Sequence, residues 1–190
     1  MDIRGTQTEK NLMTAFAGES QARNRYTFFA SKARKEGYVQ IAQIFEETAN
    51  QEKEHAKRFF SYLQGGDLEV SGKFPAGVVG TTKENLMAAA SGEKEEWTEL
   101  YPKFAEVARQ EGFDDLANQF QAIAVAERQH EHRYRGLLEG LEKGTTFVDP
   151  KPVKWRCINC GYIHEGTEAP EVCPACFHPQ AYYERLAENW

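Results

Sequence analysis

The stretch LANQFQAIAVAERQHEHRYRGLLEG, residues 116–140, places a carboxylate and an imidazole in the middle of an apolar stripe. Apolar residues recur at alternating spacings of four and three, which is typical of a helix that faces the core of a bundle. The stripe consists of Leu116, Phe120, Ile123, Glu127, His130, Tyr134 and Leu137. Because an unpaired buried charge is strongly destabilising, Glu127 and His130 need a cation or a polar network as a partner.

The chain contains an internal repeat. NLMTAFAGE (11–19) matches NLMAAASGE (85–93) at an offset of 74, with six identical residues of nine. Residues 29–59 match residues 104–134 at an offset of 75, with twelve identical residues of thirty-one. The sequence therefore predicts two copies of one helical hairpin.

Glycine and capping signals indicate where the helices begin and end. Gly37 and Gly112 hold equivalent positions and predict short hairpin turns. The Gly-rich segment 65–80 is too long for a tight turn and predicts a crossover between the copies, after which Thr81 and Glu84 form a capping box. We therefore expect helices at about 8–36, 38–64, 82–111 and 113–142.

The change of offset from 74 to 75 requires one additional residue between Glu93 and Phe104, inside the third helix. A helix absorbs a single insertion as a π-bulge, often at a functional site. Pro102 has no N–H and suits a locally interrupted hydrogen-bond ladder. We expect an i to i+5 hydrogen bond or a kink around residues 96–102.

Every predicted helix carries at least one inward carboxylate, and two helices carry Glu-x-x-His. The i, i+3 spacing stacks both side chains of that motif on one helix face. A Glu from each of two helices plus Glu-x-x-His from each of the other two is the ligand pattern of di-iron and di-manganese bundles. A satisfied polar core is the alternative, and it does not account for the repetition at matched positions. The candidate ligands are Glu19, Glu52, His55, Glu93, Glu96, Glu127 and His130.

The two halves of the predicted site are not equivalent. At the offset of 74, Glu96 corresponds to Ala22, so one metal is offered an additional carboxylate. Such asymmetry allows an ion to change ligands with its charge. Tyr26 and Tyr101 are placed to donate hydrogen bonds to the lone glutamates, although ordinary core tyrosines would have the same spacing.

A second metal signal follows the linker LEKGTTFVDPKP (141–152). Two CxxC knuckles twelve residues apart are typical of a tetrahedral four-cysteine site for iron or zinc. Disulfides are disfavoured in the reducing compartment that we expect for this chain. The predicted ligands are Cys157, Cys160, Cys173 and Cys176.

Composition limits the partners. The net charge of −6 argues against nucleic acid or an anionic membrane. The N-terminal MDIRGTQTEKN has no apolar signal region, and no apolar run approaches about 18 residues. We therefore expect a cytoplasmic protein. The sequence has no GxGxxG motif, so a nucleotide-dependent reductase would be a separate protein.

The CxxCGY and CPxC motifs resemble a rubredoxin knuckle, and together with EKEH (52–55) and ERQH (127–130) the whole chain resembles the rubrerythrin family. The resemblance implies a mainly α fold. A ferritin-like four-helix bundle with a long crossover between the second and third helices would occupy 1–147, and a small rubredoxin-like domain 148–190. It also implies a di-iron centre in the bundle and one mononuclear iron on the cysteines, where zinc is the alternative.

The resemblance also implies a role for each ligand. Glu19 and Glu93 would be terminal ligands. Glu52 and Glu127 would be bridging ligands. His130 would be the nitrogen ligand of one iron. The other iron would move from Glu96 when oxidised to His55 when reduced, which makes these two the expected catalytic residues. Two features depart from the family pattern. The two knuckles are closer together than in free-standing rubredoxins, and Phe177 stands where those proteins usually have Gly.

The implied function is reduction of hydrogen peroxide to water in protection against oxidative stress. Electrons would come from NADH through rubredoxin or an NADH-dependent reductase and pass through the four-cysteine iron. A homodimer or larger assembly is implied, in which the rubredoxin-like domain of one subunit serves the di-iron site of another. The alternatives are iron oxidation and storage with a structural zinc ribbon, dioxygen activation for hydroxylation, and a purely structural bundle.

Overall fold

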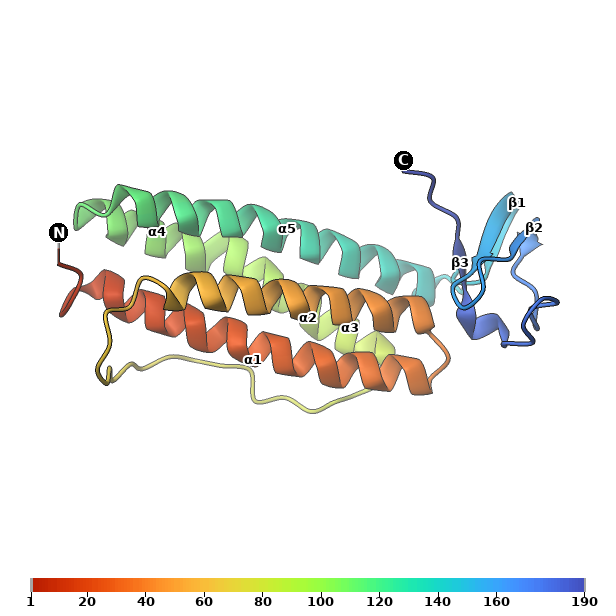
Figure 1. The fold of residues 1–190 in the computed structure, drawn as a ribbon, viewed down its shortest axis with the longest axis horizontal. Helices are drawn as coiled ribbons and strands as arrows, with labels where there is room; N and C mark the ends of the chain where they lie inside the picture. The colour runs from red at the N-terminus through yellow and green to blue at the C-terminus, as the bar shows by residue number, and fades with distance from the viewer. Residues whose placement is uncertain (1, 190) are drawn as a thin grey trace.

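The computed structural model describes residues 2–189 and shows a long helical bundle with a small β domain at one end (Figure 1). Both hairpin turns contain a glycine with positive φ, 85° at Gly37 and 83° at Gly112. The predicted mainly α fold is confirmed. Its helices are α1 (Gln7–Lys35), α2 (Val39–Phe60), α3 (Thr82–Glu95), the π-helix η1 (Glu96–Leu100), α4 (Tyr101–Gln110) and α5 (Asp114–Glu142).

The second helix ends earlier than the sequence predicts, at Phe60 rather than near residue 64. Ser61 turns the chain there, with its hydroxyl donating to the carbonyl of Arg58 at 2.7 Å. The crossover then runs along the outside of α1 to the start of α3 (Figure 1). The capping box predicted for Thr81 and Glu84 is confirmed.

Each copy of the repeat caps the first helix of the other copy. The carboxylate of Glu36, at the end of α1, accepts the backbone N–H and the hydroxyl of Thr82 at 2.7 and 2.6 Å. Glu111, at the end of α4, accepts the same two groups from Thr8 at 2.8 and 2.6 Å. A carboxylate at a helix N-terminus satisfies free N–H groups and complements the helix dipole. These contacts join the two hairpins at both ends of the bundle.

The π-helix confirms the predicted insertion. The N–H of Tyr101 donates to the carbonyl of Glu96, five residues earlier. Because the extra residue shifts the helical register, Glu93 before it and Tyr101 after it both face the bundle interior and are buried.

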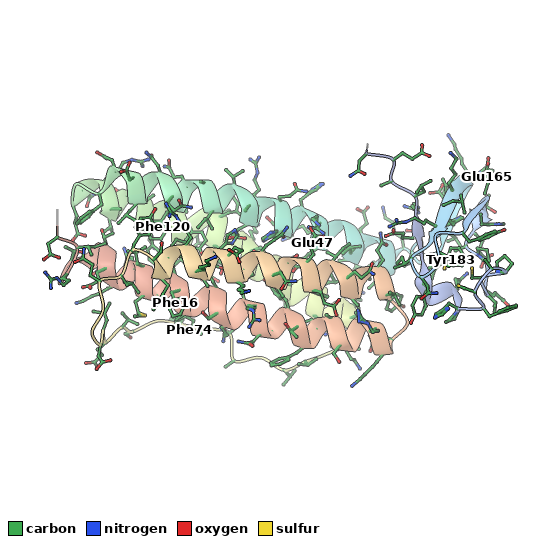
Figure 2. All side chains as sticks on the ribbon, viewed as in Figure 1. Phe16, Glu47, Phe74, Phe120, Glu165 and Tyr183 are labelled. Carbon is green, nitrogen blue, oxygen red and sulfur yellow. The ribbon has the colours of Figure 1, made fainter. Side chains whose placement is uncertain are left out.

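Two apolar clusters fill the bundle and leave a polar belt between them. The cluster nearer the β domain is built around Tyr26, Phe29, Phe45, Leu86 and Tyr134. The cluster nearer the N-terminus, which includes the labelled Phe120 (Figure 2), is built around Leu12, Phe59, Tyr101, Leu116 and Phe120. On α2 and α5 the Glu-x-x-His motifs lie between residues of the two clusters, so the ligands are enclosed by apolar packing on both sides.

The β domain is a three-stranded antiparallel sheet with strand order β2-β1-β3. Its core is separate from those of the bundle and contains Trp155 and Tyr183 (Figure 2). Phe147 stacks on Tyr38 of the bundle with ring centroids 6.3 Å apart. The strands are β1 (Val148–Cys157), β2 (Ile163–Glu168) and β3 (Tyr183–Arg185), with a short 3-10 helix η2 (Gln180–Tyr182). Within residues 2–189, no helix has the length and apolarity needed to cross a membrane.

Candidate metal centres

The bundle brings six of the seven predicted ligands into two adjoining groups. Within each group the ligand atoms lie within 4.8 Å of one another. One group consists of Glu19, Glu52, His55 and Glu127, and the other of Glu52, Glu93, Glu127 and His130. Glu52 and Glu127 belong to both groups, whereas the remaining residues belong to one. The arrangement can hold two cations side by side.

The two shared glutamates direct one oxygen to each histidine. Glu127 lies 2.9 Å from Nδ1 of His55 through Oε1 and 2.7 Å from Nδ1 of His130 through Oε2. Glu52 lies 3.0 Å from His55 through Oε2 and 3.1 Å from His130 through Oε1. Each shared carboxylate therefore lies between the two groups, with one oxygen toward each histidine.

The two lone glutamates are each held by a buried tyrosine from the other copy of the repeat. The hydroxyl of Tyr26 on α1 donates to Oε1 of Glu93 on α3, and the hydroxyl of Tyr101 on α4 donates to Oε1 of Glu19 on α1. Tyrosine hydrogen bonds to the lone glutamates are thus present, but each tyrosine reaches the glutamate of the other copy and not the one about two turns away in its own copy. Such hydrogen bonds fix the orientation of a ligating carboxylate.

Several buried polar atoms in the belt make no well-aligned hydrogen bond among the described residues, although some lie close to a histidine nitrogen or a carboxylate oxygen of the belt. They are Oε2 of Glu19, Oε1 of Glu52, Oε2 of Glu93, both carboxylate oxygens of Glu127 and Nδ1 of His130. Unsatisfied buried acceptors are rare and costly in native proteins. All of these atoms belong to residues of the two groups. Cations coordinated there would satisfy them, so the donor set fits a di-metal centre.

Glu96 is the predicted ligand that the structure leaves outside both groups. Its side chain is half-buried and lines a cavity between α1, the crossover and η1. Burial, together with the nearby charges of Glu93 and Glu127, raises the pKa of Glu96 well above its ordinary value. Glu96 therefore lies close enough to the two groups for their carboxylates to raise its pKa, but it belongs to neither group.

Four residues of the belt, Glu19, Glu93, His55 and His130, bind protons tightly when no metal is present. Burial raises the pKa of Glu19 and of Glu93 well above the ordinary value. For the histidines, burial lowers the pKa, but the close carboxylates of Glu127 and Glu52 outweigh it and raise the pKa of His55 to about 10 and that of His130 to about 12. All four groups hold more protons in the folded chain than in the unfolded chain.

We therefore expect metal-free protein to lose stability as the pH rises. The histidine contribution is complete below the unfolded pKa of about 6.5 and is lost as the pH rises through the folded values. The raised carboxyl pKa values act in the same direction from about pH 4.3 upward. Calorimetry between about pH 6 and pH 9 should show a falling melting temperature for chelator-treated protein and a much flatter profile after metal loading, because cations replace the protons. Equal slopes for both samples would contradict this reading.

The four cysteines predicted to hold a metal converge in the β domain. The Sγ atoms of Cys157 and Cys176 lie 3.7 Å apart, as do those of Cys160 and Cys173. If a metal lay at the centre of a regular tetrahedron of sulfurs, with metal–sulfur distances of about 2.3 Å, neighbouring sulfurs would lie about 3.8 Å apart. All four cysteines are free in the structure.

The knuckle backbone stabilises thiolates. The N–H of His178 is the main cause that lowers the pKa of Cys176 to about 6. Phe177 follows that cysteine with φ of 59°, the left-handed region that favours glycine. This explains why glycine is usual here in rubredoxins. The phenyl ring of Phe177 is exposed, with 79% of the residue accessible, so no packing contact offsets the backbone strain at this residue.

Sequence reasoning missed a hydrogen-bonded neighbour of the di-metal site, Gln51. Its Oε1 lies 3.0 Å from Nε2 of His130, on the ring edge opposite the carboxylates. The only signal in the sequence is its position beside Glu52, and a glutamine next to a ligand is not distinctive by itself.

A helical bundle with two histidine–carboxylate groups, joined to a four-cysteine site, defines a non-haem di-iron protein with a rubredoxin-like domain. The family model for rubrerythrin matches residues 10–138, and the model for the rubrerythrin rubredoxin-like domain matches residues 155–184. The chain belongs to the rubrerythrin family. Members of this family are oxidoreductases, generally peroxidases.

Individual relatives cover almost the whole chain. It is 59% identical over 188 residues to a rubrerythrin of Porphyromonas gingivalis, covering 99% of this chain and 94% of the relative. It is 55% identical over 188 residues to a rubrerythrin of Nitratidesulfovibrio vulgaris, covering 99% and 98%. A solved structure of fully reduced, all-ferrous nigerythrin has a TM-score of 0.64 at 30% identity, covering 97% of this chain and 91% of that one.

Proposed function

We propose that this protein is a cytoplasmic peroxidase that reduces hydrogen peroxide to water and protects the cell against oxidative stress. The observation that carries the proposal is the pair of adjoining ligand groups that share Glu52 and Glu127. Splitting the oxygen–oxygen bond takes two electrons, and two ferrous ions held side by side supply both. The domain boundaries we propose are 1–147 for the bundle and 148–190 for the rubredoxin-like domain.

The protein's own residues hold and tune the centre. We assign Glu19 and Glu93 as terminal ligands, each held by a tyrosine hydroxyl, and Glu52 and Glu127 as bridging ligands. His130 is assigned as a nitrogen ligand. His55 lies inside its group and Glu96 lies outside, which is the ligand set that the family resemblance implies for the reduced centre.

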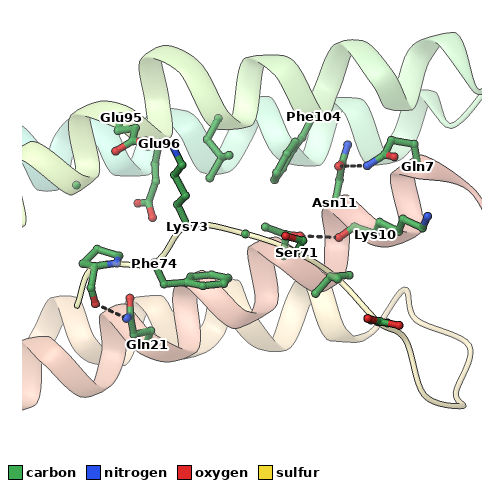
Figure 3. A pocket seen from close by; sticks show the side chains of 18 of the residues that line it. Gln7, Lys10, Asn11, Gln21, Ser71, Lys73, Phe74, Glu95, Glu96 and Phe104 are labelled. Atoms are coloured by element: carbon green, nitrogen blue, oxygen red, sulfur yellow. Dashed lines mark hydrogen bonds between the residues drawn. The ribbon is translucent and has the colours of Figure 1, made fainter.

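We propose that peroxide approaches the centre through the cavity beside Glu96. It has a volume of about 760 Å³ and is bounded by α1, the crossover and the π-helix. Glu96 extends from the π-helix toward the crossover, and Lys73 extends from the crossover back toward that helix (Figure 3). The crossover is tied to α1 where Gln21 donates to the carbonyl of Pro75 at 2.7 Å. A carboxylate that changes between ligand and free acid has room to move here.

Filling this cavity should slow the reaction without removing the metals. Gly18 lines the cavity from α1, and a side chain there would enter open space. We expect Gly18→Leu to lower the rate of peroxide consumption by about tenfold while metal content stays the same, because the route narrows and the ligands are untouched. Gly136→Leu is the matched control, since Gly136 is also a helical glycine beside open space but lines a different cavity. Equal rates for both variants would rule out this route.

Electrons must reach the centre from outside the bundle. In one chain the rubredoxin-like domain lies against the bundle near Gly37, in the turn before α2. A Cβ placed on Gly37 would lie 3.7 Å from the Cβ of Ala181. Glu52 lies about 15 residues farther along, or about 22 Å along the helix axis. Electron tunnelling slows exponentially with distance. We therefore propose a homodimer or larger assembly in which the four-cysteine iron of one subunit serves the bundle of another, supplied from NADH by rubredoxin or an NADH-dependent reductase.

The decisive experiment combines metal analysis with peroxide kinetics. Protein reconstituted with ferrous iron should contain two irons in the bundle and one on the cysteines, and the oxidised cysteine site should be coloured. Reduced protein should consume peroxide rapidly and form water. If it instead accumulates ferric mineral from ferrous ion and oxygen and barely reacts with peroxide, the protein is an iron-oxidising and iron-storing bundle.

A further inference from the structure

A chain of hydrogen bonds leads from the surface of the bundle to one of the two histidines. Nη1 and Nη2 of Arg133 donate to the carboxylate of Glu47 at 3.0 and 2.8 Å. Nε2 of Gln51 donates to Oε1 of the same carboxylate at 3.2 Å. Oε1 of Gln51 then faces Nε2 of His130 at 3.0 Å. Glu47 is exposed on α2 (Figure 2), so the chain begins in solvent and ends at a buried ring.

This chain of hydrogen bonds determines which nitrogen of His130 keeps its proton when a metal binds the other nitrogen. Hydrogen bonds from Arg133 lower the pKa of Glu47, so its carboxylate is ionised and can only accept. The amide N–H of Gln51 must therefore point to Glu47, and its carbonyl must point to His130. A carbonyl accepts only from an N–H, so Nε2 of His130 is protonated. Nδ1, which faces the carboxylates, is the atom left to bind a metal.

Within the described residues of one chain, His55 has no such anchor. Its Nδ1 also faces the carboxylates, but no hydrogen bond to its Nε2 occurs within residues 2–189. Its side chain is 16% exposed, compared with 5% for His130. The two rings stand in equivalent positions with centroids 6.0 Å apart, so the difference comes from their neighbours and not from their own placement.

The repeat identifies the cause of this difference. At the offset of 75, His55 corresponds to His130, and Gln51 corresponds to Ala126. Glu47 corresponds to Ala122. The copy that would anchor His55 therefore lacks both side chains of the hydrogen-bond chain. Residues 51 and 126 are both half-buried and residues 47 and 122 are both exposed, so the equivalent positions have similar surroundings.

We propose that Gln51 is a positioning residue that keeps His130 permanently bound through Nδ1, and that Ala126 leaves His55 free to leave its metal. This proposal rests on the proposed di-iron function and names the residues that decide which of the two metals can change ligands. A hydrogen bond from the outer nitrogen of a ligating histidine fixes the ring and raises its basicity. One metal therefore keeps its nitrogen ligand, while the other can exchange it.

The test follows the release of zinc from zinc-loaded full-length protein to a chelator in excess, with the bundle ions resolved from the cysteine-bound ion by isotope labelling. The bundle ions should leave in a slow and a fast phase. Gln51→Leu removes the acceptor and should accelerate the slow phase by about 10- to 100-fold, the usual effect of losing such a partner. Ala126→Gln supplies an acceptor beside His55 and should slow the fast phase.

Two further variants separate positioning from a general loss of structure. Gln119→Leu removes another half-buried glutamine whose Oε1 accepts from Arg58 at 3.2 Å, and neither phase should change. The double variant Glu47→Gln with Gln51→Glu exchanges amide and carboxylate but keeps an acceptor at His130, so the slow phase should return. In ¹⁵N NMR spectra of the zinc form, the Nε2 proton of His130 should exchange slowly with water in the unmodified protein and rapidly in Gln51→Leu.

Unchanged zinc release in Gln51→Leu, or slow proton exchange at His130 in that variant, would overturn the proposal. Failure of Ala126→Gln to slow the fast phase would overturn the part that concerns His55. None of these readouts depends on peroxide. A protein without peroxidase activity would refute the proposed function while leaving this result intact.

Discussion

A chain that ends at Phe147 is expected to fold and bind two irons, yet lose sustained NADH-driven peroxide turnover almost completely. Both apolar clusters of the bundle lie within this fragment, and the β domain has its own core. Phe147 remains to cover Tyr38. Chemically reduced fragment should still consume a single equivalent of peroxide per pair of irons, because the bundle ligands are all present. Stopped-flow measurement of one turnover and a coupled NADH assay separate the two steps.

The Cys157→Ser variant of the full chain provides the matching control. Cys157 is buried and lies 3.7 Å from Cys176, so its loss should remove or damage the four-cysteine metal site. We expect the same outcome as for the fragment, with one reduced turnover intact and continuous turnover lost. Full NADH-dependent activity in either protein would show that electrons bypass this domain, whose cysteines would then hold a structural metal.

The second large effect is expected from Glu96→Ala. None of the ligand groups contains Glu96, so the variant should retain two metals in the bundle. If Glu96 binds one iron in the oxidised state, its removal leaves that iron without the carboxylate it needs, and peroxide turnover should fall by more than about 100-fold. Metal analysis and steady-state kinetics on the same preparation distinguish this result from simple loss of iron.

Glu95→Ala is the matched control for that variant. Glu95 precedes the π-helix, is exposed and is one residue from Glu96, so it reports general effects of altering this turn. It should keep nearly full activity. Wild-type turnover in Glu96→Ala would refute the ligand exchange, and a crystal structure of reduced protein with His55 unbound would remove the role assigned to His55.

Periodicity and repetition predicted the helices of the bundle and their pairing into two hairpins. The apolar stripes predicted four helices, and the structure differs by a few residues at the end of α2, where Ser61 turns the chain. The offset change between the copies predicted an insertion, and the π-helix at Glu96–Leu100 confirms it. Such features depend on neighbours a few residues away, and one sequence records them directly.

The spacing of the ligands also came from sequence. Glu-x-x-His on two helices and two CxxC knuckles restrict the chemistry to a few metals, because coordination requires those side chains at those separations. The structure then brought the side chains together in two groups in the bundle and one in the β domain. The individual metal-binding roles remain predictions that the variants above can test.

Tertiary structure alone decided which groups meet across helices. Tyr26 bonds Glu93 and Tyr101 bonds Glu19, although each tyrosine lies nearer in sequence to the other glutamate. Likewise Gln51 reaches His130, 79 positions away, and Glu96 faces a cavity rather than the ligand groups. Helical periodicity places a side chain on one face of its own helix, but its partner depends on how distant helices pack and rotate against each other. No pattern within a single helix contains that information.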